Sequence, residues 1–190
     1  MSDLPVDRRA FFSRGLRTVL ARAVDSVTHR VSSGHVRPPG ALPEPAFLAA
    51  CTRCGECERV CPVQAIRPLD TTHGFAAGTP VLNVALTACV MCTDMPCAAS
   101  CPTDALELPP ERWRGTSIAT ISIDEERCIA FRDVECGVCV RVCPAGSEAL
   151  TLDSRGRPVI GGACTGCGTC ISACVTSPSS ITAHPPGGFH

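Results

Sequence analysis

Cysteine is the residue type with the clearest chemistry in this chain, because all 16 cysteines among its 190 residues fall into four motifs of four. The first and fourth motifs have the spacing C-x2-C-x2-C-x3-C, and the first three end in a Cys-Pro pair, which is typical of [4Fe-4S] ligands. We therefore predict four [4Fe-4S] clusters, with every cysteine a metal ligand. The first to fourth motifs are Cys51, Cys54, Cys57, Cys61; Cys89, Cys92, Cys97, Cys101; Cys128, Cys136, Cys139, Cys143; and Cys164, Cys167, Cys170, Cys174.

The last cysteine of each motif is expected to serve a different cluster from the other three. In two-cluster ferredoxins the cysteine before the proline ligates the cluster of the other motif, so that two motifs exchange ligands. The exchanged ligands are then Cys61, Cys101, Cys143 and Cys174.

Three irregularities distinguish these motifs from a generic ferredoxin. Four residues separate Cys92 from Cys97, which predicts a bulge before the third ligand of the second motif. Seven residues separate Cys128 from Cys136, so Cys128 is the least regular ligand assignment. The fourth motif ends in Cys174-Val175 and lacks the proline.

Disulfide and zinc sites are the two alternatives to iron-sulfur clusters. A disulfide framework distributes its cysteines to join distant loops, whereas cysteines three residues apart crowd their thiols together. Zinc ribbons separate two C-x2-C pairs by a long loop, but here a third and a fourth cysteine follow at once. The spacing therefore favours iron-sulfur clusters over both.

The composition predicts a thin hydrophobic core. Only 4% of the residues are aromatic, and glycine and proline together make 33 of 190. Cluster binding must therefore supply much of the folding free energy. Apolar side chains are expected to shield the clusters, among them Ile66, Val90, Leu106, Val142 and Ile181.

The charge pattern and the motifs absent from the sequence exclude several functions. Residues 41–190 carry more acidic than basic side chains and have no basic stripe or aromatic platform, which argues against nucleic-acid binding. We find no nucleotide-binding glycine loop between a strand and a helix, and no nucleophile with a base. The chain is thus predicted to have no catalytic residues, so that it is an electron carrier and not itself an enzyme.

The fold class expected is α+β, with two small, loop-rich, ferredoxin-like units that each hold two clusters. Residues 47–190 would form this body, with motifs at 51–61, 89–101, 128–143 and 164–174. Short extended stretches precede the later motifs, and short apolar stretches follow the motifs. The motifs pair either sequentially, first with second and third with fourth, or in a nested way, second with third inside first with fourth.

The amino-terminal region is predicted as an arm, residues 1–35, joined by a proline-rich linker, residues 36–46. Asp7 to Ser13 resembles a twin-arginine export motif, yet charged residues interrupt the following segment, 16–31. The apolar residues of that segment recur at helical spacing, which predicts an amphipathic helix that docks on a partner or an anionic membrane surface, or folds onto the body. No apolar run is long enough to span a membrane.

The chain resembles the MauM/NapG family of ferredoxin-type proteins over residues 37–185. The resemblance rests on Arg37-Pro38-Pro39-Gly40-Ala41, on Ala77-Gly78-Thr79-Pro80, on the motif segments at 50–55, 89–97 and 164–168, and on the irregular spacings. It implies four [4Fe-4S] clusters and electron transfer between a membrane quinol-oxidising subunit and a terminal redox enzyme, in a nitrate reductase or methylamine system. The second motif also resembles iron-sulfur subunits of molybdenum oxidoreductases, which favours nested pairing.

The amino-terminal segment resembles that of the NapF type instead, a cytoplasmic relative associated with maturation of a molybdoenzyme. This likeness adds a second hypothesis, an iron-sulfur accessory protein that binds the catalytic subunit of a molybdoenzyme before export. The expected location is the cytoplasm, with possible membrane association, and the alternative is the periplasm after twin-arginine export.

Overall fold

The computed structural model describes residues 34–186, which belong to one compact unit that begins at Gly34. The expected arm, with its arginine pair and the amphipathic helix at 16–31, lies outside the described residues. Within residues 34–186, no helix combines the length and the apolar character that a membrane span requires.

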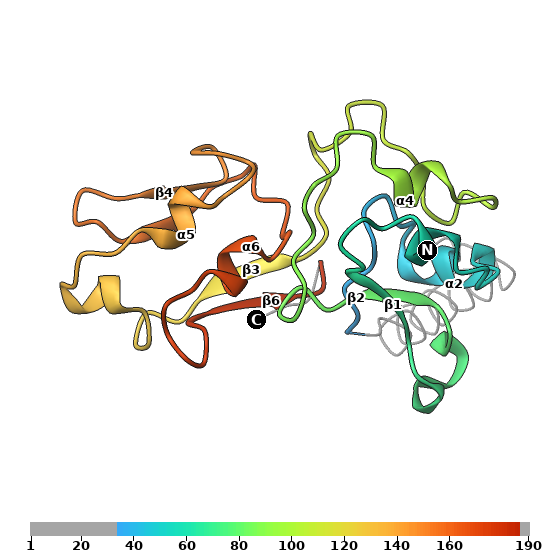
Figure 1. Cartoon of the computed structure of the whole chain (residues 1–190), viewed down its shortest axis with the longest axis horizontal. Coiled ribbons are helices and arrows are strands. Elements are labelled where there is room, and N and C mark those ends of the chain that lie inside the picture. The colour runs from blue at the N-terminus through green and yellow to red at the C-terminus, as the bar shows by residue number, and fades with distance from the viewer. Residues whose placement is uncertain (1–33, 187–190) are drawn as a thin grey trace, which may run out of the picture. The chain divides into compact units, whose positions relative to one another are not determined.

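The described chain is an α+β structure of short elements joined by long loops (Figure 1). Its strands form three separate antiparallel pairs, β1 with β2, β3 with β6 and β4 with β5. In chain order the elements are α2 (Glu44–Ala50), α3 (Glu56–Arg59), β1 (Ile66–Pro68), the 3-10 helix η1 (Thr71–Ala76), β2 (Pro80–Leu82), α4 (Pro96–Ala99), β3 (Thr120–Ile123), the 3-10 helix η2 (Ile129–Arg132), α5 (Val138–Arg141), β4 (Leu150–Leu152), β5 (Pro158–Ile160), α6 (Thr169–Ser172) and β6 (Ile181–His184).

The two halves of the described chain repeat one arrangement. In the second half, β3 and β6 pair in the register Ile121 with Ala183, and they enclose the hairpin of β4 and β5. In the first half, a single antiparallel bridge between Ala41 and Leu106 takes the place of the outer pair, and β1 with β2 forms the inner hairpin. Each half therefore has the order expected of a ferredoxin-like unit.

Pairing of the motifs is sequential, and the nested pairing favoured by the resemblance to molybdenum oxidoreductase subunits is wrong. Helix α3 of the first motif packs on α4 of the second, and α5 of the third packs on α6 of the fourth. The reason lies in the connecting segments, because the hairpins β1–β2 and β4–β5 each turn the chain back on itself. The hairpin β1–β2 thereby brings the second motif back to the first, and the hairpin β4–β5 brings the fourth motif back to the third.

The stretch predicted as a linker, residues 36–46, includes three buried residues, Arg37, Pro38 and Pro39. The guanidinium of Arg37 forms two hydrogen bonds with the Glu44 carboxylate, at 2.9 and 2.6 Å. It also donates to the Thr79 hydroxyl and to the Pro80 carbonyl, both at 2.8 Å, and its Cζ lies 4.7 Å from the centre of the Phe47 ring. A buried arginine thus ties the start of the body to α2 and β2.

The apolar core is small, as the composition predicts. The side chains of Ile66, Leu106 and Ile181 are buried, in agreement with their expected shielding role. Val90 is 49% exposed but lines the cavity beside the second motif, as expected, whereas Val142 is 38% exposed and lines none of the three cysteine cavities described below.

Replacing Arg37 by lysine is expected to destabilise the body by about 2–4 kcal/mol, because an ammonium cannot reproduce the forked contacts of a buried guanidinium. The urea midpoint of anaerobic protein, followed by circular dichroism, measures the change. Arg59→Lys is the matched control, because Arg59 pairs with Glu56 while its side chain is 71% exposed. The control should change stability by less than about 1 kcal/mol. Equal effects of the two variants would contradict a structural role of Arg37.

Candidate metal centres

All four motifs share one local structure around their third cysteine. Each of Cys57, Cys97, Cys139 and Cys170 is buried on a single-turn helix. Each helix is preceded by a residue with positive φ, which turns the chain sharply after the second cysteine. The fourth cysteine follows within two residues of the helix, and its N–H bonds to a carbonyl three residues earlier. The x3 spacing thus places the fourth cysteine directly after one helical turn.

A cavity of about 140 Å³ lies beside the first motif. It is lined by Cys51, Cys54 and Cys57 together with Cys101 from the second motif. The Cys57 thiol interacts electrostatically with all three of the others. The cavity therefore combines three cysteines of one motif with the last cysteine of its neighbour, as ligand exchange requires.

Two further cavities repeat this combination. One is lined by Cys89, Cys92 and Cys97 with Cys61 from the first motif, and its wall includes Ile66, Leu82, Met95 and Trp113. The other is lined by Cys164, Cys167 and Cys170 with Cys143 from the third motif, and its wall includes Ile121, Leu150 and Ile181. Apolar side chains dominate both walls, so these thiols face an environment that excludes water.

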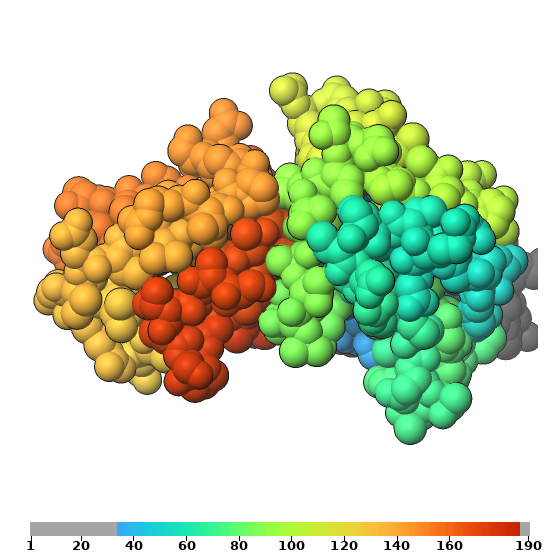
Figure 2. Space-filling model, viewed as in Figure 1, coloured from blue at the N-terminus to red at the C-terminus, as the bar shows by residue number. Residues whose placement is uncertain are grey.

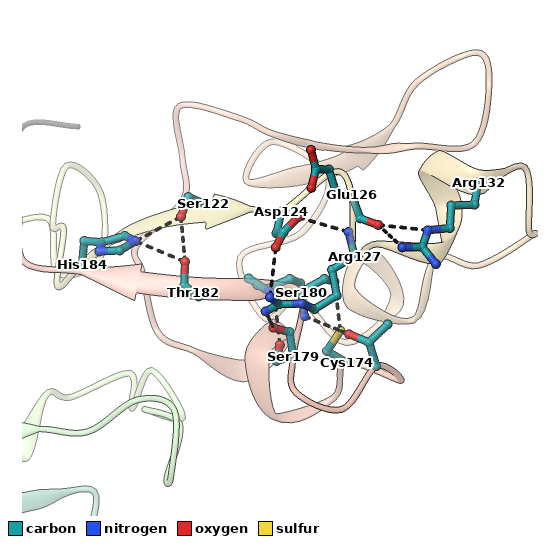
Figure 3. Close-up of polar contacts among 12 residues, drawn as sticks. Ser122, Asp124, Glu126, Arg127, Arg132, Cys174, Ser179, Ser180, Thr182 and His184 are labelled. Carbon is teal, nitrogen blue, oxygen red and sulfur yellow. Dashed lines mark hydrogen bonds and ion pairs between the residues drawn. The ribbon is translucent and has the colours of Figure 1, made fainter.

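The third motif brings Cys128, Cys136 and Cys139 together, because the Cys139 thiol interacts with both of the others. The symmetry of the exchange predicts Cys174 as the fourth cysteine of this set. A chain of contacts supports this: the Cys128 N–H donates to the Asp124 carbonyl, and the Asp124 N–H donates to the Ser180 carbonyl, at 2.9 and 2.7 Å. The Ser180 hydroxyl in turn lies 3.3 Å from the Cys174 sulfur (Figure 3). We name the sites first to fourth after the motif that gives three cysteines.

The irregular spacings are absorbed by local turns. The extra residues of the second motif end in Met95, which is fully buried and has a φ of 47° just before α4. The long gap of the third motif is filled by η2, and Cys128 directly before it is buried. Cys128 therefore reaches the other cysteines of its motif despite the irregular gap.

Burial changes the acidity of the thiols. It raises the pKa of Cys57 and of Cys89 to about 11, and that of Cys97 and Cys170 to about 12. Metal binding requires thiolates, so these groups release protons when they bind iron, and acid weakens their hold on it.

Cys174 differs from these buried thiols because of two hydroxyl groups. Burial acts to raise the pKa of Cys174, but hydrogen bonds, from the Ser180 side chain first and then from Thr176, outweigh it and lower the pKa to about 6. The Thr176 hydroxyl accepts the Ser180 N–H at 2.8 Å, which leaves its own hydrogen for the Cys174 sulfur, 3.2 Å away. Ser180 is 1% exposed, and Cys174 is the hydrogen-bond partner of its hydroxyl.

The other exchanged cysteines have weaker or fewer donors. Backbone N–H groups of Ala65 and Leu106 approach the sulfurs of Cys61 and Cys101 at 3.3 and 3.4 Å. The hydroxyl of Thr103 lies 3.8 Å from the Cys101 sulfur. The roles of Ser180 and Thr176 were not predicted from the sequence, although a hydroxyl residue two positions after the last cysteine recurs at Thr103 and was a usable signal.

The donor set fits a [4Fe-4S] cluster better than a single metal ion. A tetrahedral zinc site brings its four sulfurs within about 4 Å of one another. Among residues 34–186, no three cysteine, histidine or acidic side chains are close enough to hold one ion. Four thiols around an apolar cavity instead suit a cluster with an iron for each sulfur.

Comparison with known proteins agrees with this geometry. Residues 50–105 and 88–147 match one family described as a 4Fe-4S dicluster domain, and residues 120–175 match a second family of the same description. The matches at 50–105 and 120–175 each span one sequential pair of motifs.

The chain is similar over most of its length to several ferredoxin-type proteins. The chain is 41% identical over 160 residues to the methylamine utilization ferredoxin-type protein MauM of Methylorubrum extorquens, across 79% of this chain and 72% of that protein. It is 35% identical over 197 residues to the ferredoxin-type protein NapG of Escherichia coli, across 94% and 85%. It is 31% identical over 158 residues to the ferredoxin-type protein NapF of the same organism, across 81% and 87%.

The identities to MauM and NapG proteins extend well beyond the cysteine motifs, since each alignment covers more than three quarters of the chain. The buried Arg37 and the sequential pairs of motifs lie within the region that the sequence resemblance covers. On this evidence the chain belongs to the MauM/NapG family of ferredoxin-type iron-sulfur proteins.

Proposed function

We propose that this chain is an electron-transfer protein that holds four [4Fe-4S] clusters and carries out no substrate chemistry of its own. The observation that carries the proposal is the set of three cavities that each combine three cysteines of one motif with the last cysteine of its neighbour. When bound, each cluster supplies a centre that accepts or releases one electron.

The ligand sets follow from the exchange. The first site would be held by Cys51, Cys54, Cys57 and Cys101, and the second by Cys89, Cys92, Cys97 and Cys61. The third would be held by Cys128, Cys136, Cys139 and Cys174, and the fourth by Cys164, Cys167, Cys170 and Cys143. Apolar side chains around them exclude water, and donors to sulfur adjust the potential.

The partner we propose is a redox protein, either a membrane quinol-oxidising subunit or the catalytic subunit of a molybdoenzyme in a nitrate reductase or methylamine system. The named systems of the NapG and MauM relatives support this class of partner. Docking would use residues 16–31. The location we propose is the cytoplasm with membrane association, and periplasmic location after twin-arginine export is the alternative.

Metal analysis of anaerobically purified protein tests the cofactor content. We expect about 16 iron atoms and 16 acid-labile sulfides per chain, as four cubane clusters require. Zinc in place of iron, or a colourless protein that stays folded without metal, would overturn the proposal.

Two matched variants test the ligand exchange. Because Cys101 lines the first cavity, Cys101→Ala should alter the same EPR signal of the reduced protein as Cys54→Ala. Cys97→Ala should alter a different signal, although Cys97 and Cys101 belong to one motif. The exchange fails if Cys101→Ala and Cys97→Ala have the same spectrum.

The hydroxyl groups at Cys174 are expected to raise the reduction potential of the third site. Hydrogen bonds to a ligand sulfur stabilise the more negative, reduced state, so Ser180→Ala should lower that potential by on the order of tens of millivolts. Thr176→Val should act in the same direction. EPR-monitored redox titration measures the shift, and Ser179→Ala is the control, because the Ser179 hydroxyl bonds to the Ile181 N–H instead of a sulfur. If the reduction potential is unchanged in both Ser180→Ala and Thr176→Val, the hydroxyl groups do not raise the potential of the third site.

A second candidate function is favoured by the NapF relative, which aligns with 81% of this chain. We propose as the alternative an iron-sulfur accessory protein that binds a molybdoenzyme precursor in the cytoplasm and assists its maturation. It differs from the electron carrier in requiring tight association with the unexported precursor.

Deletion of residues 1–33 separates docking from electron transfer, because it leaves the unit that begins at Gly34 intact. We expect loss of partner capture with unchanged iron content and reduction potentials, measured by co-purification and redox titration against the full chain. Capture that survives the deletion would refute docking through residues 16–31. Fractionation with a test for leader cleavage then distinguishes the two locations.

A further inference from the structure

The ligand loops of the second and fourth motifs are in direct contact, although they belong to different two-motif units. The Cys89 N–H donates to the Cys167 carbonyl at 2.8 Å. The buried Thr165 hydroxyl donates to the Met91 sulfur at 3.4 Å, and the Ile118 N–H donates to the Thr165 carbonyl at 2.7 Å. In Figure 2 the red atoms of the fourth-motif region adjoin green atoms of the second-motif region.

Two glycines of the fourth motif allow close packing around this contact, Gly168 against Val84 of the first half and Gly166 against Ala119, directly before β3 of its own half. Gly166 has a φ of 74°, and a Cβ added there would lie 2.1 Å from the Ala119 carbonyl oxygen. Gly168 has a φ of 86°, and a Cβ added there would lie 2.6 Å from both the backbone oxygen and the Cβ of Val84. Val84 and Ala119 are 3% and 2% exposed, so the chain segments on both sides are buried against the loop. Neither position has room for a side chain.

The corresponding loops of the first and third motifs have different surroundings. Gly55 follows the second cysteine of its motif as Gly168 does, with a φ of 77°, but a Cβ there would meet nothing within 4 Å. At Gly137 the nearest atom to such a Cβ is Leu152 Cδ1, at 3.2 Å, which belongs to the same unit. At these two positions, neither loop packs against the other half of the chain.

We propose that the four metal sites lie in the spatial order first, second, fourth, third, with the second and fourth sites joined at the hydrogen bond between Cys89 and Cys167. This inference rests on the proposed function. The order differs from that of the motifs along the chain. It makes the first and third sites the two ends, at which redox partners would approach, and it makes the glycine-lined junction the link between the two units.

Two-site variants test the order by magnetic interaction. Cys54→Ala with Cys136→Ala should retain the second and fourth clusters, and Cys54→Ala with Cys167→Ala should retain the second and third. After full reduction, the EPR spectrum of the first variant should be broadened by spin–spin interaction between neighbouring clusters, and that of the other should be clearly less so. The opposite result would overturn the proposal in favour of the order along the chain.

Glycine variants of the four-cluster protein give a second test that does not depend on removing ligands. Gly168→Ala should speed hydrogen–deuterium exchange by about tenfold or more in peptides that contain Cys89 and Cys167, measured by mass spectrometry. Gly55→Ala, which puts the same strained φ on an alanine without a clash, should leave both peptides unchanged. Unchanged exchange in Gly168→Ala, or equal effects of the two variants, would refute the junction.

Iron and sulfide content of each variant separates failure of this inference from failure of the proposed function. Wild-type protein without iron would refute the cluster-binding function itself. Wild-type protein with its full iron content and a Gly168→Ala variant with unchanged exchange would refute only the junction. If a two-site variant loses all its iron, the spatial order is tested by hydrogen–deuterium exchange of the Gly168→Ala and Gly55→Ala variants alone.

Discussion

The structure depends on the division of each ligand set between two motifs. Three thiols of a set come from one motif, and the fourth comes from the neighbouring motif, as in the pocket that joins Cys57 to Cys101. Neither motif can complete its site without the other, so binding free energy at the metal also holds the two halves of a unit together. This coupling explains how so few apolar side chains suffice. Within residues 34–186, the buried set includes Phe47, Ile66 and Leu106 but no large aromatic cluster.

The thiols of the motifs also differ in how their surroundings affect their ionisation. Burial opposes ionisation of thiols such as Cys97 and Cys170, so these positions depend on iron for their charge. At Cys174 the balance is reversed, because hydroxyl donors already stabilise a negative sulfur. Cys97 and Cys170 are the third cysteines of their motifs and Cys174 is a fourth cysteine, so these two positions of a motif differ in their electrostatic environment.

The cysteine spacing is sufficient to predict the kind of site, because cysteines three residues apart gather their thiols in one place. The same spacing could not decide how the motifs pair, since that depends on the hairpins β1–β2 and β4–β5, whose strands are only three residues long. The proline-rich stretch around Arg37 suggested a linker, and only the tertiary contacts to Thr79 and Pro80 show that it is packed. The close approach of Gly168 to Val84 joins segments far apart in the sequence, and the Ser180 hydroxyl reaches Cys174 from outside the motif, so neither contact follows from the cysteine spacing.

Sequential pairing has a consequence for biosynthesis. The first unit closes at the bridge between Ala41 and Leu106, so its two ligand sets are complete before the ribosome has made the second half. Domains fold as units, and the amino-terminal one folds first during synthesis. The first half of this chain could therefore bind its iron before the second half has been synthesised. In a nested arrangement, the first motif could complete its ligand set only after the ribosome had synthesised Cys174. Its free thiols would be exposed to oxidation until then.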